Sequence, residues 1–235
     1  MILAAGDGGR LLPDTAALPK PLLRVAGRPI IDHVLDALAA AGVGTATVVT
    51  GYQGDRLREA LERRARGAVS LRFVRNDAYT LGNARSLWAA RDAAPGEFLL
   101  AMADHIVEPA LLRPLVAGAG GRCRLAVDRA APGDPRAAEA TRARLAGRRV
   151  IDLGKRLDDW DALDTGVFWC TPRVFEVMTP ELRDGEAGAV FATLARAGEL
   201  DAVDVTGARW IDIDTAHDLR RAEALFAGEA DGRVA

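Results

Sequence analysis

Lysine, asparagine, cysteine and aromatic side chains are scarce in this 235-residue sequence. Of its 31 basic residues, two are lysines, Lys20 and Lys155, and the other 29 are arginines. A position that only needs a solvated positive charge accepts either residue. A site that needs a compact ammonium group does not accept the larger, planar guanidinium. We therefore interpret Lys20 and Lys155 as candidate functional lysines.

The other scarcities exclude whole classes of protein. Only two cysteines, Cys123 and Cys170, are present and they lie far apart, which excludes a disulfide framework and a cysteine zinc site. The net charge of -2 lacks the basic excess of a nucleic-acid binder. No apolar run approaches the roughly 20 residues that span a bilayer, and no secretory leader is visible. The sequence predicts a cytoplasmic protein with no nucleic-acid partner.

The first half alternates between two kinds of apolar pattern. Hydrophobic residues make up 49% of the chain, enough for a full core. Short apolar runs predict strands at 2–5, 45–50, 71–74 and 98–102, and apolar residues at helical spacing predict helices at 29–41, 55–66 and 84–93. This alternation predicts a mostly parallel, doubly wound α/β sheet with helices on both faces.

The second half changes character, although no linker separates it from the first. Strands are predicted at 124–128, 164–170, 200–205 and 209–211, with a hairpin formed by 139–145 and 149–153. Helices are predicted at 173–178, 189–197 and 215–226, the last with Thr215 as its N-cap, and 130–138 is expected to be a flexible loop. We predict a single domain over 1–235, in which 122–235 adds a partly antiparallel lobe to 1–121.

A glycine-rich loop follows the first predicted strand. The segment LAAGDGGRL at 3–11 is followed by PKPL at 19–22. Glycines let backbone N–H groups approach phosphate oxygens, and Arg10 and Lys20 add positive charge. Leu11 occupies the place of the third glycine in a dinucleotide fingerprint, which disfavours a dehydrogenase, and Lys20 comes too late for a P-loop. The pattern indicates a phosphate loop of a third kind.

Three acids follow predicted strands. Asp104 comes directly after the strand at 98–102, where parallel sheets bind ligands. In the segment WIDIDT at 210–215, alternation places Asp212 and Asp214 on one face. Carboxylates are the ligands that a hard cation such as Mg²⁺ prefers. Asp214 either orients the loop or caps the helix that starts near Thr215. His105 either supports the metal-ligating acids by a side-chain contact or is a packed residue, and packing is the favoured interpretation.

The segment LGNARSL at 81–87 brings an amide and a hydroxyl together. Asn83 and Ser86 lie one helical turn apart, so both can face the edge of a base. The alternative is an ordinary capped helix start.

Together these motifs resemble the signature of the sugar-phosphate nucleotidyltransferases. The second-half groups at 128–129, 139–141, 154–157 and 164–166 extend the similarity over nearly the whole chain. There the sequence is most similar to the inositol-1-phosphate cytidylyltransferases, the soluble part of bifunctional proteins of di-myo-inositol phosphate phosphate synthesis. The resemblance implies a Rossmann-like nucleotidyltransferase fold. It also implies a Mg²⁺-dependent enzyme that joins CTP to myo-inositol 1-phosphate and releases pyrophosphate.

The resemblance also assigns roles to residues. It implies a mainly nucleotide-binding half at 1–121 and a mainly acceptor-binding half, with the second metal ligand, at 122–235. Asp104 and Asp212 would hold Mg²⁺, and Arg10, Lys20 and Lys155 would be catalytic. The nucleotide would be held by Leu3, Ala4, Ala5, Gly6, Gly8, Gly82, Asn83 and Ser86, and the phosphorylated polyol by Glu139, Thr141, Lys155 and Asp164.

Other readings of the sequence stay open. The acceptor could instead be another sugar 1-phosphate, phosphocholine or a phosphonate. A different class of function is a regulatory module that binds a nucleotide without turnover. The last five residues, Asp231–Ala235, resemble the start of a second domain. The chain is therefore expected to be fused to, or associated with, a membrane-embedded CDP-alcohol phosphotransferase, which would place it at the inner face of the membrane.

Overall fold

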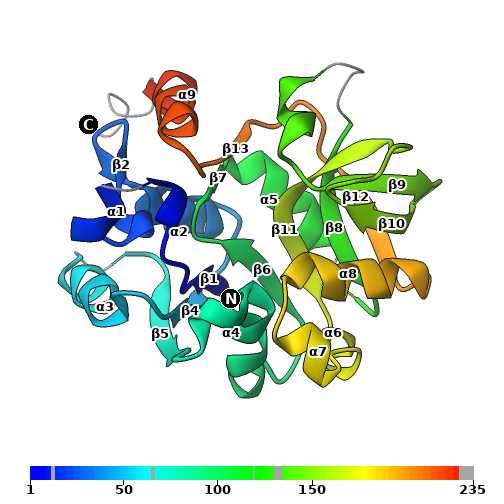
Figure 1. Ribbon diagram of the computed structural model, residues 1–235, viewed down its shortest axis with the longest axis horizontal. Helices are drawn as coiled ribbons and strands as arrows, with labels where there is room; N and C mark the ends of the chain where they lie inside the picture. The colour runs from blue at the N-terminus through cyan, green and yellow to red at the C-terminus, as the bar shows by residue number, and fades with distance from the viewer. Residues whose placement is uncertain (12–13, 65–66, 119, 130–133, 228–235) are drawn as a thin grey trace.

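A single large sheet runs through the chain. The computed structural model describes residues 1–11, 14–64, 67–118, 120–129 and 134–227. Within these residues, nine strands form one sheet in the order β5-β4-β1-β6-β11-β8-β12-β10-β9 (Figure 1). The strands of this sheet are β1 (Ile2–Ala4), β4 (Thr45–Thr50), β5 (Ser70–Arg75), β6 (Phe98–Met102), β8 (Cys123–Asp128), β9 (Arg142–Ala146), β10 (Arg149–Gly154), β11 (Ala162–Cys170) and β12 (Leu200–Asp204).

Two small ribbons and a set of helices surround this sheet. The ribbons pair β2 (Arg24–Val25) with β3 (Arg28–Pro29), and β7 (His105–Val107) with β13 (Trp210–Asp212). The helices are α1 (Asp14–Ala17), α2 (Ile30–Ala40), α3 (Gly54–Arg63), α4 (Asn83–Ala89), α5 (Pro109–Ala117), α6 (Arg173–Glu176), α7 (Pro180–Arg183), α8 (Ala187–Arg196) and α9 (Ala216–Phe226).

The strands of the first half are parallel. β1 lies between β4 and β6, so that Leu3 is level with Val49 on one side and Met102 on the other. Parallel neighbours end at the same edge of a sheet, and ligands bind there in α/β folds. The register therefore brings the glycine-rich loop after β1 next to Asp104, which follows β6.

Helices cover both faces of this parallel part. Successive side chains of a strand point to opposite faces. Ile2 of β1 packs in a core with residues of α2 and α5, whereas Leu3 packs in a second core with residues of α4 and α8. The sheet is therefore doubly wound, as the alternating pattern of the sequence predicts.

The second half adds strands of mixed direction. β11 runs antiparallel to both β6 and β8, and β12 returns parallel to β8. The hairpin of β9 and β10 follows, and β9 also pairs with β11, so this lobe curls back on itself. An α/β fold with an added, partly antiparallel lobe is confirmed.

Some elements differ from the prediction. The sequence analysis assigned no element to β7 or α5, because three strand residues and a nine-residue helix containing Pro114 show little periodicity. The helix predicted at 84–93 ends at Ala89 and continues as a 3-10 turn. Residues 135–138 of the expected loop form a 3-10 helix, whereas 130–133 and the tail at 231–235 lie outside the described residues. Among the described helices, none has the length and apolarity that a bilayer crossing requires.

Candidate active site

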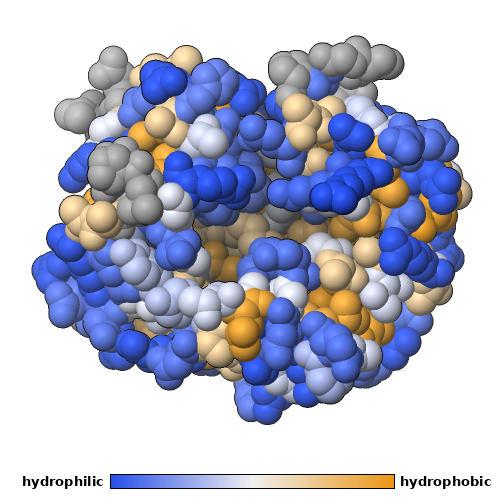
Figure 2. Space-filling view, viewed as in Figure 1, coloured by the Kyte–Doolittle hydropathy of each residue, from blue (hydrophilic) through white to orange (hydrophobic). Residues whose placement is uncertain are grey.

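A cleft of about 1590 Å³ opens between the two halves of the molecule. Figure 2 shows it as a hollow in the middle of one face, with largely hydrophilic side chains around its rim. The lining includes every residue that the sequence analysis assigned to a site: Leu3, Ala4, Ala5, Gly6, Gly8, Arg10, Lys20, Gly82, Asn83, Ser86, Asp104, Glu139, Thr141, Lys155, Asp164 and Asp212. Motifs far apart in the sequence therefore share one cavity.

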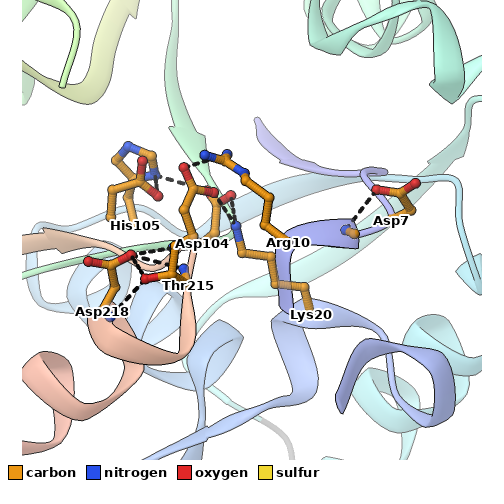
Figure 3. A network of polar contacts seen from close by, with 10 residues as sticks. Asp7, Arg10, Lys20, Asp104, His105, Thr215 and Asp218 are labelled. Atoms are coloured by element: carbon orange, nitrogen blue, oxygen red, sulfur yellow. Dashed lines mark hydrogen bonds and ion pairs between the residues drawn. The ribbon is translucent and has the colours of Figure 1, made fainter. Parts of the chain in front are cut away.

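The glycine-rich loop forms one wall of the cleft. Gly8 adopts a φ of +64°, a conformation that favours glycine. The Asp7 carboxylate accepts a hydrogen bond of 3.0 Å from the Gly9 N–H (Figure 3). Gly51, which the sequence analysis overlooked, lies against the loop, and a Cβ there would come within 2.7 Å of the Ala5 carbonyl oxygen. Its place directly after a predicted strand was the only available signal.

Lys20 is the centre of a buried ionic network. Its ammonium group donates to Asp104 Oδ2 at 2.7 Å and to Asp214 Oδ1 at 2.9 Å, and Arg10 lies 2.5 Å from Asp214 Oδ2 (Figure 3). The Lys20 side chain is only 9% exposed. Burial by itself would lower the Lys20 pKa, but the surrounding carboxylates raise it above its usual range. Lys20 therefore stays charged at neutral pH.

Asp104, His105 and Asp212 form a second, overlapping cluster. Their possible ligand atoms lie within 4.8 Å of one another, an arrangement that could hold a metal ion. His105 Nδ1 is 2.9 Å from Asp104 Oδ1 and 3.6 Å from Asp212 Oδ1. The ring thus joins the acids, which agrees with the less favoured of the two alternatives for His105, a contact that supports the acids, rather than with packing alone. The signal for this role was its position next to Asp104.

The charges in this cluster depend on one another. Burial raises the Asp212 pKa to about 6, although His105 opposes the shift. Burial would lower the His105 pKa, but Asp212 and Asp104 raise it to about 9. Burial would also raise the Asp104 pKa, yet Lys20 and His105 hold it well below its usual range. Among the residues that the structure describes, none forms a hydrogen bond with the buried Asp212 Oδ1, so this carboxylate retains an unused acceptor.

Asp214 faces the cleft and does not cap the helix that follows it. The start of α9 is capped by Thr215 and Asp218 (Figure 3). The Asp218 carboxylate accepts hydrogen bonds from the Thr215 N–H at 2.9 Å and from the Thr215 hydroxyl at 2.7 Å. In return, Thr215 Oγ1 accepts a hydrogen bond from the Asp218 N–H at 3.2 Å. The capping alternative for Asp214 is therefore wrong, whereas the prediction of Thr215 as N-cap is confirmed. Asp214 is left to pair with Lys20 and Arg10.

A buried carboxylate supports the strand that carries Asp212. Asp128, which is 4% exposed, accepts a hydrogen bond from Trp210 Nε1 at 2.8 Å and from Arg136 at 2.6 Å. Arg136 also lies over the Trp210 ring. Trp210 is part of β13, two residues before Asp212. Asp128 thereby ties the end of β8 to the strand that presents Asp212 of the acid cluster.

The far wall contains the residues assigned to the acceptor. Glu139 and Lys155 are exposed at the rim, while Thr141 and Asp164 lie deeper. Asp164 Oδ1 accepts from the Gly166 N–H at 2.7 Å, and burial raises the Asp164 pKa to about 6. Gly166 has a φ of +76°, and a Cβ at this position would collide with the His105 ring. The acceptor wall and the acid cluster are thus in direct contact.

Comparisons with known proteins agree with this geometry. Residues 1–159 match the MobA-like NTP transferase domain. The chain is 38% identical to a bifunctional IPC transferase and DIPP synthase of Rubrobacter xylanophilus and 31% identical to one of Aquifex aeolicus, covering 97% and 98% of this chain. The chain spans 52% of the length of each of these relatives.

A solved structure resembles the chain over its full length. The structure of the inositol-1-phosphate CTP transferase from T. maritima superimposes with a TM-score of 0.85 and 25% sequence identity. The match covers 100% of this chain and 96% of that chain. The similarity therefore includes the cleft and both of its walls.

Proposed function

This chain belongs to the MobA-like NTP transferase domain family, and we propose that it joins CTP to myo-inositol 1-phosphate, forming CDP-inositol and pyrophosphate. The observation that carries the proposal is the cleft that these motifs share. The glycine-rich loop with Arg10 and Lys20 lines one wall, Lys155 and Asp164 line the other, and Asp104 and Asp212 lie between them. The names of the relatives and of the T. maritima structure support the choice of CTP and of inositol 1-phosphate.

The reaction is a displacement at the α-phosphorus. An oxygen of the acceptor phosphate attacks, the bond to the β-phosphate oxygen breaks, and its electron pair leaves with pyrophosphate. The acceptor is already an anion at neutral pH, so the reaction needs no strong general base and no covalent intermediate. What remains is positioning and charge neutralisation. Arg10 and Lys20 neutralise the leaving pyrophosphate, and Lys155 positions the attacking phosphate.

The acid cluster suits Mg²⁺. Hard cations take oxygen ligands, and the cluster offers the Asp104 and Asp212 carboxylates. Asp212 Oδ1 has no hydrogen-bond partner in the described part of the chain. Asp104 and Asp212 would hold the ion, which when bound neutralises phosphate charge. His105 is less suitable as a ligand for Mg²⁺, and in this structure its ring contacts both acids.

Identification of the product tests this proposal. We expect mass spectrometry to detect CDP-inositol when the chain is incubated with CTP, myo-inositol 1-phosphate and Mg²⁺. The Asp104→Ala variant should stay folded and form no product, because the cluster loses one of its two carboxylates. Full activity of that variant would overturn the mechanism, and a product formed with another phosphorylated acceptor would overturn the choice of acceptor.

The cellular setting is also part of the proposal. Association with a membrane-embedded CDP-alcohol phosphotransferase would place the chain at the inner face of the membrane and deliver its product directly. Fractionation of cells that express the complete gene tests this association. We expect the chain in the membrane fraction, and recovery in the cytoplasmic fraction alone would contradict it.

A further inference from the structure

Two side chains on the nucleotide side of the cleft present hydrogen-bond donors whose direction is fixed by their neighbours. We propose that Asn76, a residue outside the motifs, acts through Ser86 to make this site read cytosine and reject uracil. The inference rests on the proposed function, because it assumes that a pyrimidine triphosphate binds here. It rests on the hydrogen bonds of Asn76, Asn83 and Ser86.

The orientation of the Asn83 amide is set by α8. The Asn83 carbonyl oxygen accepts a hydrogen bond of 2.5 Å from the Ala187 N–H, and the Ala84 N–H donates to the Gly185 carbonyl oxygen at 3.0 Å. These two bonds tie the start of α4 to the start of α8. Only the carbonyl end of an amide can accept, so the Asn83 NH₂ group is the end left over. Within the described part of the chain, that NH₂ group has no acceptor.

The hydrogen bond of Ser86 is oriented in the same way by Asn76. The Asn76 carbonyl oxygen accepts from the Ala78 N–H at 3.0 Å, which leaves its NH₂ group to donate to Ser86 Oγ, also at 3.0 Å. Asn76 is only 3% exposed and Ser86 2%, so this bond is protected from water. Because Ser86 Oγ already accepts, its own proton is free to be donated. No other residue that the structure describes accepts this proton.

The hydrogen-bond donors of Asn83 and Ser86 match the acceptors of cytosine but not the N3–H group of uracil. The cytosine ring presents two adjacent acceptors, N3 and O2, whereas uracil carries a hydrogen on N3. Asn83 and Ser86 both line the cleft and lie one helical turn apart. Against cytosine both donors find acceptors, and against uracil at least one donor faces another donor. A site that leaves buried polar groups unpaired with the wrong substrate discriminates strongly.

Substitutions that reverse a donor test this inference. Asn76→Asp replaces the NH₂ group by a carboxylate oxygen, which would accept the Ser86 proton and withdraw it from the base. We expect the ratio of kcat/KM for CTP to that for UTP to fall by about ten- to a hundred-fold. Asn83→Asp, at a less buried position, should lower the same ratio. The Asn83→Asp variant still accepts the hydrogen bond from the Ala187 N–H. It therefore provides a second test if the Asn76→Asp variant does not fold.

The ratio of kcat/KM for CTP to that for UTP distinguishes a positioning role of Asn76 from a merely structural one. A structural defect lowers kcat/KM for both nucleotides by one factor, and an unchanged ratio in Asn83→Asp and in folded Asn76→Asp would overturn the inference. If Asn76 acts through Ser86, adding Asn76→Asp to Ser86→Ala should not lower the ratio further. A further drop of ten-fold would contradict that route.

Binding measurements distinguish a failure of this inference from a failure of the proposed function. Calorimetry with CTP and with UTP needs no turnover, and we expect the unmodified chain to bind CTP at least ten-fold more tightly. Equal affinities for CTP and UTP would overturn the inferred recognition of cytosine, but they would not contradict the proposed reaction. A preference for CTP without formation of CDP-inositol would support the reading of the base and overturn the proposed reaction.

Discussion

Lys20 and Lys155, the two lysines of an arginine-rich chain, occupy opposite environments in the same cleft. Lys20 is buried between Asp104 and Asp214 at 2.7 and 2.9 Å, whereas Lys155 is exposed at the rim. Loss of either carboxylate partner would destabilise the folded protein, because an unpaired ion in the protein interior is strongly unfavourable. Lys20 is therefore the lysine that arginine is least able to replace.

Replacing each lysine by arginine tests this difference. Lys20→Arg keeps the charge but adds a planar group for which the buried site has little room. We expect kcat/KM to fall by about a hundred-fold, or roughly 2.7 kcal/mol. Lys155→Arg is the matched control, and at the exposed rim it should lose less than about ten-fold. The account of Lys20 would be wrong if Lys20→Arg worked as well as Lys155→Arg.

Asp164 is predicted to bind the acceptor, and this role should lower stability at neutral pH. Burial raises its pKa in the folded protein to about 6, above the value near 3.9 of an unfolded chain. Its contribution to stability is therefore fully present below about pH 4 and is lost as the pH rises through 6. The charged carboxylate at neutral pH makes the site available to hydroxyl groups at the expense of the fold.

Thermal unfolding of the Asp164→Asn variant measures how much stability the charged Asp164 carboxylate removes at neutral pH. The amide can still accept from the Gly166 N–H but carries no charge. We expect the free energy of unfolding to rise by up to about 3 kcal/mol at pH 7.5 and to change little at pH 4. Equal effects at both pH values would show that the buried charge is not the cause.

At the scale of elements, β11 is held against the acid cluster at one backbone position. Gly166 has a φ of +76° and sits where a Cβ would collide with the His105 ring. The ring in turn contacts Asp104 and Asp212 and has little freedom to move aside. The close approach of β11 to β7 therefore sets the geometry of Asp104 and Asp212.

Gly166→Ala should disturb both stability and activity. The strained backbone and the collision together are expected to cost roughly 2–4 kcal/mol of unfolding free energy, and displacement of His105 should lower kcat. Gly147→Ala is a matched control, because Gly147 also has a positive φ, of +61°, but has nothing within 4 Å of the added Cβ. That control should lose about 1 kcal/mol and keep its kcat. Equal losses of kcat in the two variants would contradict this reading of Gly166.

Elements with strong periodicity were predictable from the sequence, and short ones were not. The strand at 45–50 matches β4 at both ends, and the helix at 215–226 matches α9 with Thr215 as its cap. Three-residue β7 has no pattern of its own and exists because it pairs with β13, some hundred residues later. Pairing over such a distance is a property of the folded chain.

The same division applies to the site. Residues in local motifs, such as Lys20 and Asn83, were identified because neighbouring residues in the sequence mark them. The role of Asp214 depends on contacts with Lys20 and Arg10, far away in the sequence, so capping and loop orientation could not be separated in advance. Asn76 lies outside all of the sequence motifs, and its hydrogen bond to Ser86 is visible only in the structure.

For the whole molecule, the continuous sheet explains how two substrates can share one site. β11 joins the parallel half directly to the added lobe through β6 and β8, so the walls of the cleft belong to one continuous sheet. Figure 1 shows the lobe and the first half side by side on this common core. The division into a nucleotide half at 1–121 and an acceptor half at 122–235 remains a prediction about ligands.

The proposed reaction is tested by measuring pyrophosphate release with Mg²⁺ for each of the common nucleoside triphosphates, with and without myo-inositol 1-phosphate. We expect release only when CTP and this acceptor are both present. Release with CTP and a different phosphorylated acceptor would contradict the assignment of the second wall. The absence of release under every condition would contradict the enzyme itself and favour a module that only binds nucleotides.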